Sequence, residues 1–211
     1  MRIGVCGTQC TGKSTFIQDF LKNWPNYKAD GKKYTDFVKE KGLTLNEESN
    51  EYSQKTILDF TVERILTYKK EDNVILDRTV LDNLVYTLWL NEHDKVQNSF
   101  LKETALVVKE SLVFYDLLLF FPITKASPVV FTPSEHRSCS EQYRMEIDNI
   151  FKGLLQLYYK NSTAFFPFDN KIGCPAIVEI FGNREERIAL TKMYLDENGN
   201  VFGEKDSLIA Q

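Results

Sequence analysis

The pattern G-x-x-x-x-G-K-S/T occurs near the start of the chain, as Gly7-Thr8-Gln9-Cys10-Thr11-Gly12-Lys13-Ser14. A short apolar run at residues 3–6 precedes it and predicts a strand, and an amphipathic run from residue 13 predicts a helix. The two glycines let the backbone adopt positive φ and curl around an anion, so that successive N–H groups point inward. The following helix adds the positive end of its dipole. The pattern therefore predicts a phosphate-binding loop rather than a simple glycine turn.

Two side chains of the octapeptide suggest what the loop binds. Lys13 would reach the outer phosphates of a nucleoside triphosphate, and the hydroxyl of Ser14 would be a ligand of the bridging Mg²⁺. We expect Lys13, as a loop residue, to be exposed. ATP and Mg²⁺ are the predicted cofactors, with contacts from all eight loop residues and from the next residue: Gly7, Thr8, Gln9, Cys10, Thr11, Gly12, Lys13, Ser14 and Thr15.

Length and composition narrow the class of protein. The 211 residues, 43% of them hydrophobic, predict one domain with a sizeable core. The longest apolar run, residues 117–123, is too short to span a membrane. The first strand begins close to Met1, which leaves no room for a signal peptide, and the four cysteines show no C-x-x-C pair. We therefore expect a cytoplasmic protein with reduced thiols.

The charge of the chain bears on its partners. The formal net charge is −4, and the pI is about 5.4. An acidic protein has no global field that attracts polyanions, so a small-molecule partner is favoured over DNA. A local basic groove for DNA stays open as an alternative, as does a homodimer.

Apolar runs and amphipathic segments alternate along the chain. The patterns predict strands at residues 3–6, near 27, and at 74–76, 117–121 and 176–181. They predict helices at residues 13–24, 34–41, 51–70, 80–90, 97–114, 140–160 and 184–195, with a short tail over 196–211. Strands separated by helices of this length indicate an α/β fold with a parallel sheet covered on both faces. Ligands of such sheets bind at the carboxyl ends of the strands.

A charged pair follows the predicted strand at residues 74–76. Asp77 could hold Mg²⁺ or accept a proton from an attacking hydroxyl, and Arg78 could clamp a phosphate. The alternative is a structural ion pair between the two. Asp82 and Tyr86 share a face of the next helix that we expect to point back toward the acceptor. For Tyr86, a place in the core is an equal alternative.

Another polar segment follows the predicted strand at residues 117–121. Residues 131–137 contain turn formers and no apolar period, which indicates a lid over about 124–145 that delivers Arg137 to the transferring phosphoryl group. Arg144, farther along, would bind phosphate charge or else pair with Glu141 or Asp148 on a helix surface. Asn183 would contact the nucleotide base or else only cap the last helix.

Together these motifs resemble the small P-loop kinases related to nicotinamide riboside kinases and to nucleoside and nucleotide kinases. The resemblance covers about residues 1–195 and includes single-domain kinases of bacteriophages. It implies a three-layer αβα sandwich with a five-stranded parallel sheet in the order 2-3-1-4-5. It also implies a lid over the donor and an acidic–arginine pair at the acceptor.

The resemblance leads to a functional expectation with three forms. We expect an ATP- and Mg²⁺-dependent kinase that phosphorylates a nucleoside, a nucleotide or a related small acceptor. One alternative is a kinase of 5-hydroxymethyluracil bases in phage DNA. Another is a P-loop ATPase or GTPase switch without a small acceptor, although the sequence lacks the N-K-x-D motif for guanine.

Overall fold

Strands and helices alternate in the structure as the sequence patterns predict. The computed structural model describes residues 1–31, 33–127, 140–159 and 174–202. In chain order the elements are β1 (Arg2–Cys6), α1 (Lys13–Asn23), β2 (Lys28–Ala29), α2 (Tyr34–Lys41), the 3-10 helix η1 (Asn46–Glu48), α3 (Glu51–Thr67), β3 (Val74–Asp77), α4 (Val80–Glu92), α5 (Asn98–Leu112), β4 (Leu117–Phe120), α6 (Glu141–Tyr159), β5 (Ala176–Glu179) and α7 (Arg184–Lys192).

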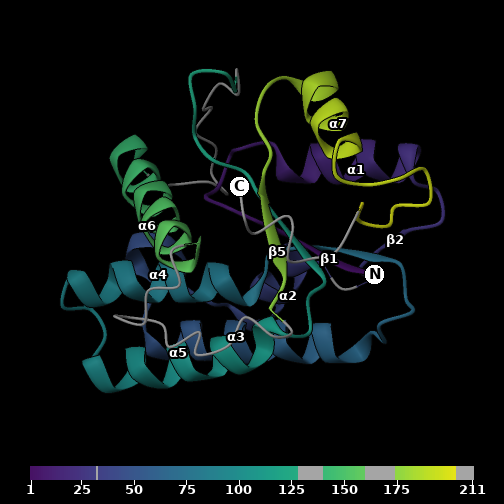
Figure 1. Ribbon diagram of the computed structural model, residues 1–211. Coiled ribbons are helices and arrows are strands. Elements are labelled where there is room, and N and C mark those ends of the chain that lie inside the picture. Colours follow the sequence, from purple (N-terminus) through teal and green to yellow (C-terminus); the bar gives the residue numbers. More distant parts are fainter. Residues whose placement is uncertain (32, 128–139, 160–173, 203–211) are drawn as a thin grey trace.

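The strands form one parallel sheet in the order β2-β3-β1-β4-β5 (Figure 1). This order is the one that the resemblance implies. At the centre, Gly4 of β1 lies opposite Leu76 of β3 on one side and Leu118 of β4 on the other. The carboxyl ends of β1 and β3 are therefore adjacent, and the segments that follow them meet at one edge of the sheet.

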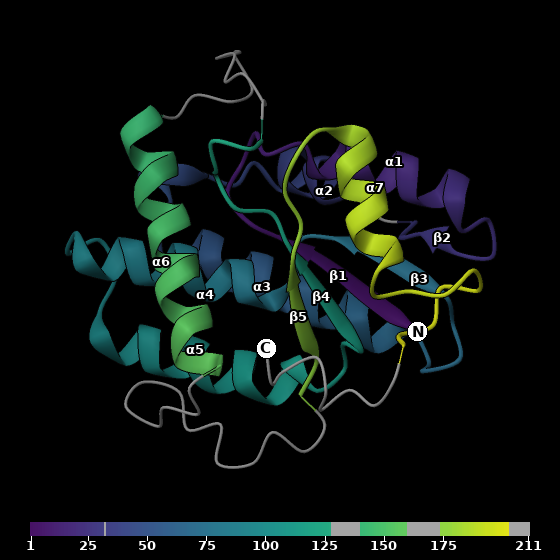
Figure 2. The ribbon, with the colours of Figure 1, turned by 45° about the horizontal axis from the view of Figure 1, so that its top comes forward.

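Helices cover both faces of the sheet, which gives the predicted three layers. Helices α1 and α7 lie side by side on one face, and α3, α4, α5 and α6 lie toward the other (Figure 2). Alternate residues of β1 enter the two cores: Ile3 and Val5 pack with Phe16 and Phe20 of α1, whereas Cys6 belongs to the cluster on the opposite face. Among the described residues, no helix is long and apolar enough to cross a membrane.

The structure differs from the predicted elements mainly at the C-terminal side. The last helix ends at Lys192, and Leu195 forms an antiparallel bridge with Val201. The carboxylate of Asp196 accepts the N–H groups of Asn198 and Asn200, which closes the turn between them. This turn packs on the α1 side of the sheet, where Trp24 donates to the Asp196 carbonyl. The described part of the predicted tail is therefore ordered structure.

Gly4 provides a test of the packing at the centre of the sheet. In Gly4→Ala, the new Cβ would lie 2.6 Å from Cγ2 of Thr79 and 2.8 Å from Cδ2 of Leu118. We expect the free energy of unfolding to fall by about 1–3 kcal/mol or more. Gly153→Ala is the control, because its Cβ would meet no atom within 4 Å on an exposed face of α6, and alanine favours a helix. Urea denaturation measures the free energy of unfolding of both variants and of the wild type. A Gly4→Ala variant as stable as the wild type would contradict the close packing.

Candidate functional site

The octapeptide forms a tight loop between β1 and α1. Gly7 has φ 131° and Gly12 has φ 83°, and Cys10 between them also has a positive φ of 56°. A Cβ on Gly7 would lie 2.7 Å from the carbonyl oxygen of Phe121, so the position also needs glycine for space. The backbone therefore has the curled form that the motif predicts, at the carboxyl end of the central strand.

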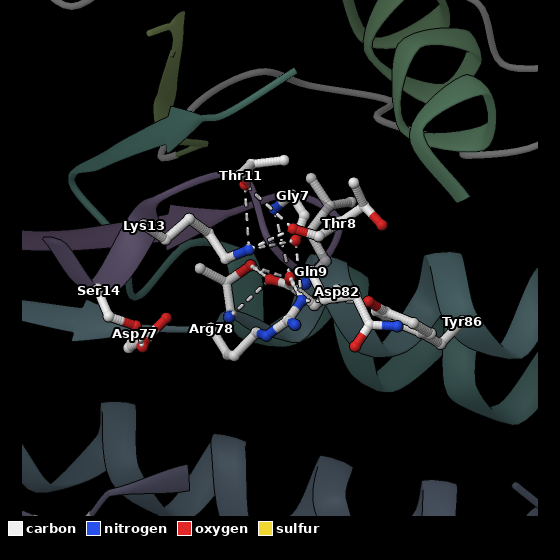
Figure 3. A network of polar contacts seen from close by, with 12 residues as sticks. Gly7, Thr8, Gln9, Thr11, Lys13, Ser14, Asp77, Arg78, Asp82 and Tyr86 are labelled. Atoms are coloured by element: carbon white, nitrogen blue, oxygen red, sulfur yellow. Dashed lines mark hydrogen bonds and ion pairs between the residues drawn. The ribbon is translucent and has the colours of Figure 1, made fainter. Parts of the chain in front are cut away.

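Lys13 folds back into this loop (Figure 3). Its ammonium donates to the carbonyls of Gly7 (2.9 Å) and Thr8 (2.5 Å) and lies 3.4 Å from Oγ1 of Thr11. The expected exposure is wrong, because Lys13 is only 6% exposed. Burial, together with the nearby Arg78 guanidinium, lowers the pKa of Lys13 to about 7, against the opposing effect of Asp77. The ammonium of Lys13 thus lies inside the loop formed by residues 7–14, the phosphate cradle, and it loses its proton more readily than a lysine in water.

Arg78 also faces the loop. Its Nη1 donates to the carbonyl of Gly7 and to Oδ1 of Asp82, both at 2.8 Å. The guanidinium lies near the rings of Tyr86 and Tyr34, 5.5 and 5.9 Å from their centroids. The backbone of Arg78 has φ 74°, a conformation that non-glycine residues adopt at a cost and that often marks a functional position. The ion pair that Arg78 forms is therefore with Asp82, not with Asp77 as the structural alternative supposed.

Asp82 is engaged on both carboxylate oxygens. Besides Arg78, its Oδ1 accepts the N–H of Gly7 at 3.3 Å, and its Oδ2 accepts the N–H and hydroxyl of Thr79 at 2.9 and 3.0 Å. These bonds include the capping box at the start of α4. The buried carboxylate faces the phosphate loop, which favours a supporting role over the predicted contact with an acceptor. The hydroxyl of Tyr86 lies 3.4 Å from Arg78, beside this cluster.

Ser14 and Asp77 form the candidate metal site. The Ser14 hydroxyl donates to Oδ2 of Asp77 at 3.0 Å, which joins the first turn of α1 to the end of β3. A hydroxyl and a carboxylate are oxygen ligands of the kind that Mg²⁺ takes together with substrate phosphates. Among the described residues, no group of three or more His, Cys, Asp or Glu side chains could hold a metal alone. The two residues therefore fit Mg²⁺ carried by a nucleotide.

Arg144 contacts the loop from α6. Its Nε donates to the carbonyl of Gln9 at 3.1 Å and its Nη2 to the carbonyl of Cys10 at 3.3 Å, and the side chain is buried. Asp148, one suggested partner on the helix surface, is instead engaged by Lys152 and by the N–H of Ile123. Arg144 thus reaches the phosphate loop itself. Arg137 and the centre of the predicted lid lie outside the described residues.

A pocket of about 270 Å³ adjoins the loop. Its lining comes from two segments, the start of α1 and the start of α7: Gly12, Thr15, Phe16, Asp19, Gly182, Asn183, Arg184 and Arg187. The side chain of Asn183 caps α7 by accepting the N–H groups of Glu185 and Glu186, so the capping alternative is confirmed. Asn183 nevertheless lines the pocket, as a residue near a nucleotide base would.

Sequence reasoning missed two arginines of the site. Arg187 of α7 donates to the carbonyls of Gly182 and Thr11, both at 2.8 Å. Arg64 of α3 lies 2.5 Å from the Asp30 carboxylate just after β2, and its Nη2 donates to the Asp77 carbonyl at 3.0 Å. The sequence signal for both was weak, since Thr11 and Asp30 are distant from these arginines in the chain and an arginine within a helix usually lies at the surface.

Comparison with known proteins identifies the family. A sequence profile described as an AAA domain matches residues 2–161, and the chain belongs to this family. No curated protein sequence matches the chain significantly.

Solved structures resemble the chain at low sequence identity. A deoxyadenosine kinase from M. mycoides with the products dCMP and dCDP has a TM-score of 0.60 at 17% identity, covering 90% of this chain and 96% of that one. NadR in complex with NR has a TM-score of 0.59 at 12% sequence identity, and the match covers 92% of this chain but 50% of that one. Thymidylate kinase from Candida albicans has a TM-score of 0.52 at 16% sequence identity, and the match covers 92% of this chain and 88% of that one. These likenesses confirm the P-loop kinase resemblance at the level of the fold.

The lowered pKa of Lys13 predicts proton uptake on phosphate binding. Free Lys13 has a pKa of about 7, and a bound polyphosphate favours the charged form, so the pKa rises on binding. Triphosphate binding at pH 8.5 should therefore take up close to one proton, and affinity should fall as pH rises above 7. Calorimetric titrations in two buffers of different ionisation enthalpy measure the uptake. It should vanish in Lys13→Ala and persist in Lys102→Ala, which changes an exposed lysine of α5. Uptake that is unchanged in Lys13→Ala would contradict this assignment.

Proposed function

We propose that the protein is a cytoplasmic, ATP- and Mg²⁺-dependent kinase that phosphorylates a nucleoside, a nucleotide or a related small acceptor. The observation that carries the proposal is the convergence of Lys13, the Ser14–Asp77 pair and Arg78 at the carboxyl ends of β1 and β3. The loop and Lys13 would hold the phosphates. Mg²⁺, held through Ser14 and Asp77, would neutralise phosphate charge when bound.

The rest of the donor has a place beside the loop. The pocket between α1 and α7 begins at Gly12, the residue that opens α1, and extends away from the phosphate cradle. Its volume of about 270 Å³ suits a base and part of a sugar. We assign it to the base of the donor nucleotide, with Thr15 and Asn183 in its wall. Arg144 would keep the loop in position, and Arg137 stays the predicted lid residue.

The acceptor would bind on the other side of the loop. The groups there are a guanidinium flanked by aromatic rings, Arg78 with Tyr34 and Tyr86, and the Asp30–Arg64 pair after β2. Aromatic faces and charged hydrogen-bonding groups together suit a nucleoside with its sugar hydroxyls. In the transfer, an acceptor oxygen bonds to the γ-phosphorus as the bond to the β–γ bridging oxygen breaks. The acceptor's proton would go to a carboxylate, for which Asp77 is the candidate.

A screen of acceptors tests this function. Labelled ATP and Mg²⁺ are offered with nucleosides, nucleoside monophosphates, nicotinamide riboside, and DNA containing 5-hydroxymethyluracil, and labelled products are separated. We expect transfer to a small acceptor. Transfer to DNA alone would favour the DNA kinase, and release of phosphate without transfer would favour an ATPase.

Lys13→Ala is the matched variant for the screen. We expect transfer to fall about a hundredfold or more, because the charge that faces the transferred group is lost. The fold should persist, since the Gly7 carbonyl keeps its bond from Arg78 and the Thr8 carbonyl keeps one from Thr11. Lys102→Ala should match the wild type. A folded Lys13→Ala variant with normal transfer would refute the kinase proposal.

Asp77→Asn separates transfer from nucleotide binding. The amide keeps the shape and an oxygen for Ser14 but removes the charge that would hold Mg²⁺ or take the proton. We expect ATP affinity to stay within about tenfold, or about 1.4 kcal/mol, while single-turnover transfer falls about a hundredfold or more. Asp59→Asn on the exposed face of α3 is the control. Full activity of Asp77→Asn would move the catalytic carboxylate elsewhere.

A further inference from the structure

An ion pair forms part of the wall of the pocket between α1 and α7. Nε of Arg184 donates to Oδ2 of Asp19 at 2.8 Å, and its Nη2 donates to Oδ1 at 2.7 Å. Both carboxylate oxygens are therefore held by one guanidinium in a two-pronged arrangement. The Asp19 side chain is 14% exposed, while that of Arg184 is 66% exposed. Arg184 also lowers the pKa of Asp19, so the carboxylate is ionised at neutral pH.

Among the lining residues from α1, Asp19 lies farthest along the chain from the phosphate loop. The lining residues of α1 run from Gly12 through Thr15 and Phe16 to Asp19. Seven residues of helix span about 10 Å. With phosphates in the loop and the base in the pocket, as the proposed function has it, Asp19 lies near the outer edge of the base.

Arg187 contributes a second guanidinium to the same wall, and not all of its donors are hydrogen-bonded within the described part of the chain. Arg187 is 4% exposed and uses Nε and Nη1 to donate to backbone carbonyls. Its Nη2 is buried, and no hydrogen-bond acceptor for it is found among the described residues. A guanidinium only donates, and because Nη2 lies beneath the pocket surface, a ligand acceptor would reach it only after the wall shifts to expose it. The ring nitrogens of a purine are acceptors of this kind.

The two observations together bear on which purine fits. Guanine carries two adjacent donors, N1–H and N2–H, which a carboxylate can accept together, whereas adenine has an acceptor at N1 and a donor at N6. The carboxylate in the wall is Asp19, and the fork of Arg184 spans both of its oxygens, at the edge where two parallel donors of guanine would bind. Guanine would therefore have to displace Arg184 or leave its two donors to water, so it would gain less from this wall than from an unpaired carboxylate.

We propose that the Asp19–Arg184 pair determines the donor base, and that by masking the Asp19 carboxylate it selects adenine over guanine. This inference rests on the proposed function, because it takes the pocket to hold the donor base. Lys22 lies 3.8 Å from Oδ1 of Asp19 and could replace the missing guanidinium. The test therefore removes both cations.

The experiment measures calorimetric affinities for ATP and GTP with Mg²⁺. We expect the wild type to prefer ATP. Lys22→Ala/Arg184→Ala exposes the carboxylate and should raise GTP affinity relative to ATP about tenfold. Adding Asp19→Asn should abolish that gain, because an amide accepts with only one oxygen. Lys192→Ala removes an exposed charge from α7, the helix that carries Arg184, and should leave the ratio of GTP to ATP affinity unchanged.

The outcomes separate this inference from the function on which it rests. Equal affinity of the wild type for ATP and GTP overturns base selection but keeps nucleotide binding. Base selection is also overturned if the ratio of GTP to ATP affinity is unchanged in the Lys22→Ala/Arg184→Ala variant, or if the gain in GTP affinity persists after Asp19→Asn is added. Failure of the folded wild type to bind either nucleotide overturns the proposed function as well. Thermal unfolding of each variant shows that it is folded.

Discussion

The carboxylate of Asp82 holds the site together. It accepts from the Gly7 backbone in the phosphate loop, from Arg78 after β3, and from Thr79 at the start of α4. Three segments of chain therefore meet at one buried anion, and their relative positions depend on it. A buried charge is tolerated only where it is paired and hydrogen-bonded on all sides. This requirement leaves Asp82 little freedom to serve a substrate, and it fixes Arg78 beside the loop.

Fixing Arg78 there places a second cation beside Lys13 at the loop. Arg78 and Lys13 both donate to the Gly7 carbonyl, and Arg78 lowers the pKa of Lys13. Burial is the main cost of charging Lys13, and repulsion from Arg78, which shares one acceptor with it, adds to that cost. A polyanion entering the cradle would relieve both costs at once. The residue that brings in this second cation also has a strained backbone, with a positive φ at Arg78.

The sequence predicted the order of elements and the edge of the sheet at which the candidate site residues meet, because both follow from local signals. Buried strands are short apolar runs, and the motif residues that follow them meet wherever parallel strands end together. The pairing of Asp30 with Arg64 and the support from Arg187 were not predictable, since each joins residues that only the fold brings together. The burial of Lys13 was missed for a related reason. The motif describes the loop around phosphate, whereas the structure without phosphate offers carbonyl oxygens to the ammonium.

Those carbonyls also explain why arginines surround the loop. A loop that turns its N–H groups inward to bind an anion must direct carbonyl groups elsewhere, and buried carbonyls need donors. Arg144 of α6 supplies them to Gln9 and Cys10, and Arg187 of α7 supplies one to Thr11. The shape of the cradle thus depends on two helices from the later part of the chain. Because Arg144 lies in the first turn of α6 and near the end of the range 124–145 predicted as a lid, a shift of this part of α6 would change the contacts of Arg144 with the loop carbonyls. Donor binding and lid position would then be linked through this one guanidinium.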